Sequence, residues 1–413
     1  MISLGENMSE VRSFFSRNRT VFSLGLVSIL ISSLVGLVSG VTLGYMTGLL
    51  EIVPALMLLI TPAIGVRGSI FGAVGSRLGT AVHMGTFELS FKRGSVLRQN
   101  VETSIILTIV MAVVMGLFAK LAAIFMGIES ISLHEFVFIS VMGGTLSSLI
   151  LILVNIVVAV TGFKHDWDLD NISAPIITAT GDIVTMPMLF GTTLLVLNPH
   201  FTDYLLLFFS IIFSVIAIIL VAYVILKKKD EVRRIFIQSI PTLLIFIIIE
   251  IIAGSLINNE LESFIALPAL LIMVSPFLGS SNSLGGILTS RFSSYLHMGL
   301  LRPKALPGKL AFENFAITYV FGIFAFTLIG VATFVVGGLL GMQSPPLSTM
   351  IVLSLIAGMI STTILSILAY YLSIATFRMS LDPDDHTIPL ITSMIDVFGV
   401  VAFVATILLL GLA

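Results

Sequence analysis

"PALMLLITPAIGVRGSIFGAVGSRLGTAVHMG", residues 54–85, returns as "PALLIMVSPFLGSSNSLGGILTSRFSSYLHMG", residues 268–299, 214 residues later and without a gap. The same offset carries Asn100 to Asn314, Pro175 to Pro389 and Asp182 to Asp396. Similarity at a fixed offset is the signature of an internal duplication. The sequence therefore predicts two copies of one structural unit.

The composition predicts the class of protein. The chain has 413 residues, of which 57% are hydrophobic and only 10% are charged, whereas a soluble domain carries about 25% charged residues. Apolar runs of about 20 residues recur along the chain, which is typical of transmembrane helices. These runs are continuous rather than alternating, which excludes a membrane β-barrel. There are no cysteines, which excludes disulfides and thiolate metal sites. We expect an all-α polytopic membrane protein.

Eleven transmembrane helices are predicted. Residues 1–21 form a short cytoplasmic N-terminus, 22–197 a first transmembrane repeat, 203–226 a linking helix and 236–411 a second transmembrane repeat. The predicted spans are 22–47, 52–78, 100–126, 135–161, 172–197, 203–226, 236–257, 263–290, 312–340, 348–376 and 387–411.

The basic residues predict the orientation in the membrane. Of the 20 lysines and arginines, 18 fall in alternate loops on one side, while Arg67 and Lys120 lie inside spans. Because cytoplasmic loops are rich in Lys and Arg, we expect a multi-pass protein of the cell membrane with a cytoplasmic N-terminus and an extracellular C-terminus.

The number of spans predicts how the repeats are related. Five spans per repeat is an odd number, so two repeats joined directly would be inverted relative to each other. The span at 203–226 has no counterpart in the duplication and restores the parity. A 5+1+5 arrangement therefore predicts two parallel five-helix repeats about a pseudo-two-fold axis normal to the membrane. A single chain is expected to function as a pseudo-dimer.

Two similar segments each end in an aspartate. "DNISAPIITATGD", residues 170–182, and "DDHTIPLITSMID", residues 384–396, place Asp182 and Asp396 ten residues into their predicted spans. Ten residues of helix rise about 15 Å, which is close to the middle of a ~30 Å hydrocarbon core. A carboxylate there costs at least ~2.5 kcal/mol and is read as functional by default. The alternative is a structural aspartate that is held by hydrogen bonds.

Parallel two-fold symmetry limits what the two aspartates can do. Symmetric carboxylates meet only near the axis, where they either share a proton or bind a cation. Oxygen ligands without Cys or a nearby His favour a hard cation such as Mg²⁺, which gives up its waters reluctantly. Asp182 and Asp396 are therefore the predicted metal ligands, with Mg²⁺ as the transported ion and Mn²⁺ or another divalent cation still open. The expected partners are this ion and the lipid bilayer, and no nucleic acid.

Further polar residues are predicted along the ion pathway. Thr178 and Thr392 lie one helical turn before the aspartates, and Asn282 lies in "GSSNS" of the eighth span; ordinary helix packing is the alternative for the threonines. Acidic residues before the fifth and eleventh spans predict a cytoplasmic vestibule that concentrates cations, although N-capping explains part of this pattern. They are Asp168, Asp170, Asp382, Asp384 and Asp385.

Two charged residues inside predicted spans have open roles. Glu250 serves a coupling ion or is simply hydrogen-bonded, and its repeat partner is Gly36. Arg67 balances a buried acid or extends its head group to the membrane surface.

Residues 62–80 and 170–182, with their copies in the second half, resemble the MgtE-type divalent-cation transporter family. The resemblance is greatest to the fused-repeat branch that contains the solute carrier 41 magnesium transporters. It implies a central Mg²⁺ site on the two-fold axis, formed by fifth-span aspartates that correspond to Asp182 and Asp396. Many members have Asn before the fifth-span proline, where Ala174 and Ile388 stand here. No cytoplasmic regulatory domain of the bacterial kind is recognisable.

Two alternatives belong to other functional classes. A Na⁺- or H⁺-coupled transporter or exchanger for another cation or substrate is one; inward movement of a dication at −100 mV gains about 4.6 kcal/mol, so Mg²⁺ uptake alone needs no coupling ion. An intramembrane aspartyl protease is the remote one, because its Gly-x-Gly-Asp pattern has Ala179 in place of the first glycine. The chain is therefore expected not to be an enzyme.

Overall fold

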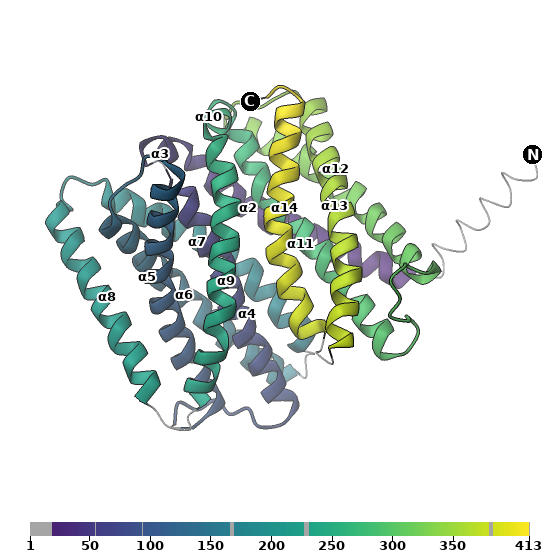
Figure 1. Ribbon diagram of the computed structural model, residues 1–413, viewed down its shortest axis with the longest axis horizontal. Coiled ribbons are helices and arrows are strands. Elements are labelled where there is room, and N and C mark those ends of the chain that lie inside the picture. Colours follow the sequence, from purple (N-terminus) through teal and green to yellow (C-terminus); the bar gives the residue numbers. More distant parts are fainter. Residues whose placement is uncertain are drawn as a thin grey trace, which may run out of the picture. The chain divides into compact units, whose positions relative to one another are not determined.

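A computed structural model describes residues 19–53, 55–92, 94–165, 169–226, 231–379 and 383–412, and the regular elements in these ranges are all helices (Figure 1). Eleven of these helices are long and apolar enough to cross a membrane, as the sequence predicts. They are α2 (Arg19–Tyr45), α4 (Met57–His83), α5 (Val96–Met126), α6 (Leu133–His165), α7 (Leu169–Val196), α8 (Asp203–Leu226), α9 (Glu231–Asn259), α11 (Pro268–His297), α12 (Lys309–Leu339), α13 (Leu347–Arg378) and α14 (Pro383–Leu409). The prediction of a polytopic all-α protein is confirmed.

The duplication is visible in the helix boundaries. Helix α6 begins at Leu133 and α13 begins at Leu347, while α4 ends at His83 and α11 ends at His297. Two short helices that the sequence analysis did not predict, α3 (Thr47–Ile52) and α10 (Leu261–Ala266), show the same spacing of 214 residues. The duplication therefore includes the short helices and turns between the long helices as well as the long helices themselves.

The second long helix begins later than predicted. The predicted span starts at residue 52, but α4 starts at Met57, after a turn in which Ala55 has a φ of 64°. Val53 precedes a proline in the sequence, and the residue before proline is disfavoured in the α-helical region. The amide N–H of Ala55 donates a hydrogen bond to Asn258 Oδ1 at 3.2 Å, which satisfies one backbone donor of this turn.

The chain divides into two compact units. Unit 1 consists of Met1–Leu37, Met273–Val336 and Pro345–Leu410, and unit 2 of Val38–Ile272, Gly337–Ser344 and Gly411–Ala413. Unit 1 therefore contains α2 up to Leu37 with most of α11 to α14, whereas unit 2 contains the end of α2 and α3 to α10. These units do not coincide with the sequence repeats, because α9 belongs to the second repeat and α2 to the first.

The first long helix of each repeat packs on the second long helix of the other repeat. In unit 1, Ser32 Oγ of α2 donates to the carbonyl oxygen of Gly279 on α11 at 3.0 Å. In unit 2, α9 packs on α4, and Thr61 Oγ1 donates to the carbonyl oxygen of Glu250 at 2.8 Å. With the predicted repeat bounds of 22–197 and 236–411, each repeat therefore packs its first helix on the other repeat.

Glycines set the distance at these two helix crossings. A Cβ added to Gly36 of α2 would lie 2.5 Å from Pro276 Cα, and one added to Gly254 of α9 would lie 2.5 Å from the carbonyl oxygen of Met57. Both neighbours are backbone atoms, which cannot rotate away as a side chain can. Close approach through small residues is the usual way in which helices pack in membranes.

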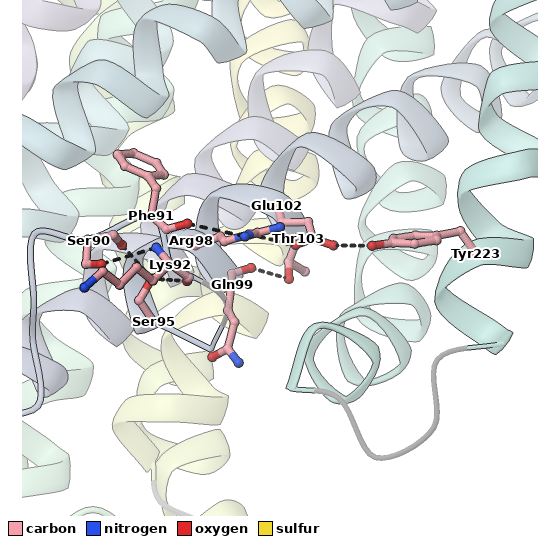
Figure 2. A network of polar contacts seen from close by, with 9 residues as sticks. All are labelled: Ser90, Phe91, Lys92, Ser95, Arg98, Gln99, Glu102, Thr103 and Tyr223. Carbon is pink, nitrogen blue, oxygen red and sulfur yellow. Dashed lines mark hydrogen bonds and ion pairs between the residues drawn. The ribbon is translucent and has the colours of Figure 1, made fainter.

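The linking helix α8 packs against α5 and α6 of unit 2 (Figure 1). Ser210 Oγ donates to the carbonyl oxygen of His134 at 2.6 Å near the start of α6. At the other end of α8, Tyr223 Oη donates to Glu102 Oε1 at 3.0 Å, and Figure 2 shows this bond beside the contacts of the α4–α5 loop. The extra helix is therefore held at both ends by repeat 1.

The replacement Gly36→Ala is expected to destabilise the protein, because overpacking against a fixed backbone costs about 1–3 kcal/mol. The melting temperature of the purified protein in detergent should fall measurably. Gly48→Ala in α3 is the matched control, since nothing lies within 4 Å of its added Cβ, and it should leave the melting temperature unchanged or slightly raised. Equal shifts in both variants would contradict this account of the crossing.

Candidate functional site

The carboxylate of Asp396 is held by a neighbouring helix of unit 1. Asp396 lies on α14 and is partly buried, and Asn282 Nδ2 of α11 donates to its Oδ1 at 2.8 Å. The structure therefore brings together two of the residues that the sequence singles out. The amide oxygen of Asn282 is buried and has no hydrogen-bond partner among the described residues.

The "GSSNS" segment, residues 279–283, gives α11 polar contacts on three sides. The hydroxyls of Ser280 and Ser33 lie 2.9 Å apart, and Ser283 Oγ donates to Ser32 Oγ at 2.9 Å, so that two contacts face α2. Ser361 Oγ of α13 donates to Ser281 Oγ at 3.2 Å. These bonds fix the rotation of α11 about its axis, which in turn holds Asn282 toward α14.

Glycines bring α11 and α14 together around this pair. A Cβ on Gly285 would lie 2.5 Å from Ile395 Cδ1, and one on Gly399 would lie 3.0 Å from Leu278 Cδ2. Ile395 immediately precedes Asp396, so the close contact at Gly285 lies directly beside the carboxylate. Without side chains at these two positions, the Asn282 amide reaches the carboxylate across a short gap.

Asp182 has different surroundings in unit 2. It is partly buried on α7, which packs against α4 and α6. The position on α4 that corresponds to Asn282 is Gly68, so no side-chain amide comes from there. The two aspartates are equivalent in sequence, but the amide that meets Asp396 has no counterpart at position 68.

The remaining predicted pathway residues are described only in part. Thr392 is partly buried on α14, one turn before Asp396. The side chains of Thr178 and of the predicted vestibule acids lie outside the described part of the structure; these acids are Asp168, Asp170, Asp382, Asp384 and Asp385. Among the described residues, no three His, Cys, Asp or Glu side chains gather where they could hold a metal ion, and a site with one carboxylate from each repeat has fewer than three.

Arg67 is turned into unit 2 and does not extend to the membrane surface. Its side chain is 2% exposed, and Nη1 donates to the carbonyl oxygen of Ala63 at 2.7 Å, one turn back along α4. The guanidinium lies against Gly144 of α6, where a Cβ would collide with Nη2. Nε and Nη2 have no hydrogen-bond partner within the described ranges. The prediction that Arg67 extends its head group to the membrane surface is therefore wrong. Its other predicted role was to balance a buried acid, and among the described residues no acid pairs with this guanidinium.

Glu250 is also buried in unit 2, with 5% of its surface exposed. Its carboxylate lies against Gly65 of α4, where an added Cβ would be 2.7 Å from Oε1. Its repeat partner, Gly36, is the glycine that contacts Pro276 in unit 1. The two repeats therefore differ at this position: the first has a glycine in close contact with a neighbouring helix, and the second has a buried acid.

Sequence reasoning missed the serines that support Asn282. Ser32, Ser33 and Ser361 are spread over two helices, and their only signal is a polar residue in an apolar span. Ser280, Ser281 and Ser283 flank Asn282 in the quoted repeat, but their partners depend on which helices pack together.

Known proteins match this chain over the helices described above. The family model MgtE, described as a divalent cation transporter, matches residues 60–192 and 274–406. Solute carrier family 41 member 3 of Rattus norvegicus is 25% identical over 365 residues, covering 83% of this chain and 77% of the relative. Solute carrier family 41 member 2 of Mus musculus is 24% identical over 379 residues, covering 84% of this chain and 62% of the relative. No solved structure matches.

The two matched regions have the same 214-residue spacing as the helices, and together they include both aspartates and Asn282. Proteins of this kind are transporters and not enzymes, so the aspartyl protease alternative is excluded. The chain is a multi-pass membrane protein that belongs to the MgtE family of divalent cation transporters.

Proposed function

We propose that this chain transports Mg²⁺ through the membrane past a site formed by Asp182 and Asp396, one from each repeat. The observation that carries the proposal is the carboxylate of Asp396, which lies partly buried on a membrane-spanning helix and is oriented by Asn282. A carboxylate in this position attracts a cation strongly because little water screens its charge. Two such groups together neutralise one dication.

The donors and acceptors around Asp396 suit a hydrated ion. The amide nitrogen of Asn282 donates a hydrogen bond to Oδ1 of the carboxylate. The amide oxygen of Asn282 is buried and accepts no hydrogen bond from any described residue. The waters of a hydrated cation donate hydrogen bonds, and Mg²⁺ keeps several of its waters when it binds to carboxylates. We therefore propose that the carboxylate and the amide contact the ion through its water shell, with Thr392 and Thr178 along the same path.

A coupled transporter or exchanger is the second candidate. Glu250 is a carboxylate with 5% exposure on a membrane-spanning helix of unit 2, and such groups often carry coupling ions or protons. Inward Mg²⁺ movement is already favoured by the membrane potential, so coupling is needed for export. Mg²⁺ efflux from vesicles that depends on an opposing Na⁺ or pH gradient would favour this candidate over passive conduction.

We also propose that both repeats run parallel, with the N-terminus in the cytoplasm and the C-terminus outside the cell membrane. Pro199, between α7 and α8, and Ala305, between α11 and α12, are both exposed and lie on opposite sides in this topology. Because the chain has no native cysteine, single cysteines report on each loop. In intact cells, Pro199→Cys should react with a membrane-impermeant maleimide, whereas Ala305→Cys should react only after permeabilisation. The reverse pattern would overturn the orientation.

The replacements Asp182→Asn and Asp396→Asn each remove one negative charge at nearly constant size. Each is expected to lower Mg²⁺ flux by at least about tenfold, because a desolvated charge interaction at close range is worth several kcal/mol. The measurement is Mg²⁺ uptake into proteoliposomes with an internal fluorescent indicator, with Mn²⁺, Ca²⁺ and Co²⁺ as competitors.

Two further variants make this test specific. Asp203→Asn changes an exposed acid at the start of α8 that contacts His134, and it should leave the flux unchanged. Asn282→Gly copies position 68 of the first repeat and should give an intermediate flux, since both carboxylates remain. Wild-type flux in both aspartate variants, with melting temperatures that show folded protein, would refute the proposed site.

A further inference from the structure

A cavity of about 330 Å³ lies between α12 and α13 of unit 1, and neither Asn282 nor Asp396 lines it. Its wall includes the aromatic side chains of Phe312, Phe315 and Tyr319 on α12 and of Tyr370 and Tyr371 on α13. This volume is within the range of small-molecule sites, which are mostly apolar with a few placed polar groups.

The wall of the cavity is preformed by packed rings. The ring centroids of Phe312 and Phe315 lie 5.8 Å apart, and those of Phe315 and Tyr370 lie 6.2 Å apart, both in edge-to-face geometry. Tyr370 Oη also donates to the carbonyl oxygens of Lys304 and Leu306, at 2.9 and 3.2 Å. The loop before α12 is thereby tied to α13, so the cavity does not depend on a ligand to hold it open.

The cavity also offers polar atoms. The hydroxyls of Tyr319 and Thr363 lie 2.6 Å apart across the two helices. Ser366 lines the cavity, is 4% exposed, and has no hydrogen-bond partner for its Oγ within the described ranges. Because buried polar groups normally have a partner, this hydroxyl marks a place where a ligand would supply one.

The same face of unit 2 is built differently. In unit 2, every position that corresponds to Tyr319, Thr363, Ser366, Ile367 and Tyr371 is aliphatic: Ile105, Leu149, Ile152, Leu153 and Val157. Although α8 packs elsewhere on α5 and α6, these side chains other than Ile152 are exposed, and aliphatic side chains are sufficient where a surface meets only bulk acyl chains. The rings and hydroxyls of unit 1 therefore indicate a more specific occupant.

Basic residues lie next to the cavity where α12 begins. Lys309 is the first residue of α12, one turn before Phe312, and Arg302 and Lys304 precede it in the loop. All three are exposed, and the nearest acid along α12 is Glu313, so this segment carries a net positive charge. In the proposed orientation this end of α12 faces the cytoplasmic leaflet, which is the leaflet that holds anionic lipids.

We propose that this cavity binds one anionic phospholipid, with an acyl chain against the rings, an ester carbonyl oxygen accepting from Ser366 Oγ, and the phosphate near Lys304 and Lys309. Two apolar side chains at the cavity are exposed, those of Phe312 and Ile367. They give the acyl chain of the lipid a route into the cavity from the bilayer. Helix α13 packs on α14, and Thr376 and Thr387 lie 2.8 Å apart between them. Lipid bound to α13 would therefore brace the helix that carries Asp396.

Native mass spectrometry of the purified full chain from vesicles of phosphatidylglycerol and phosphatidylcholine tests the proposal. Wild-type protein should retain one phosphatidylglycerol in preference to phosphatidylcholine. The double variant Tyr319→Ile/Ser366→Ile, which copies the first repeat, should retain about tenfold less of either lipid. Lys304→Gln/Lys309→Gln should retain phospholipid but lose its preference for phosphatidylglycerol by about thirtyfold, since each of the two basic residues near an anionic surface contributes about 1 kcal/mol.

Leu149→Ala/Leu153→Ala, on the aliphatic face of unit 2, is the matched control and should retain lipid as the wild type does. Melting temperatures of all variants report whether they are folded. The proposal is overturned if wild-type protein retains both lipids equally, or if Tyr319→Ile/Ser366→Ile retains as much phosphatidylglycerol as the wild type. It is also overturned if the wild type instead appears as a dimer that this variant abolishes, because the cavity would then hold a second copy of the chain.

Discussion

The cost of a carboxylate inside a bilayer is the constraint on which the rest of this structure depends. An acid in a membrane-spanning helix must have hydrogen bonds, a counter-charge or water. In unit 1 the amide of Asn282 meets Asp396, and the serines around Asn282 connect α11 to α2 and α13. The polar residues of "GSSNS" thus act together to hold one charged group in place. Because a neutral amide holds that group without cancelling its charge, the proposed function assigns it the binding of a cation.

Duplication explains the general plan of the chain, and divergence explains its asymmetry. The helices recur every 214 residues, yet their interior polar groups do not. Unit 1 contains Asn282 and the serine contacts, whereas unit 2 contains the buried Arg67 and Glu250. A site with one aspartate from each repeat would therefore have two unequal halves.

The sequence predicted the helices and the duplication well, because long apolar runs and a gapless repeat are local signals. It also singled out both Asn282 and Asp396, which the structure joins by a hydrogen bond, while their place on an ion pathway stays a prediction. It did not predict that α2 and α9 pack with the opposite repeats, because hydrophobicity identifies a buried face but not its partner. The start of α4 was misplaced by five residues, since the positive φ at Ala55 lies within an unbroken apolar run. The inward position of Arg67 likewise depends on space at Gly144, which belongs to a distant part of the chain.

The central proposal is that Asp182 and Asp396 share one divalent ion. The absence of native cysteines allows a direct test with Asp182→Cys/Asp396→Cys and Cd²⁺, which thiolates bind well. Titration of the thiolate-to-cadmium absorption should give one Cd²⁺ per chain, bound at least about tenfold more tightly than by either single-cysteine variant. If the double variant binds Cd²⁺ no more tightly than the single variants, the two positions do not meet at one ion, and the proposed site is wrong.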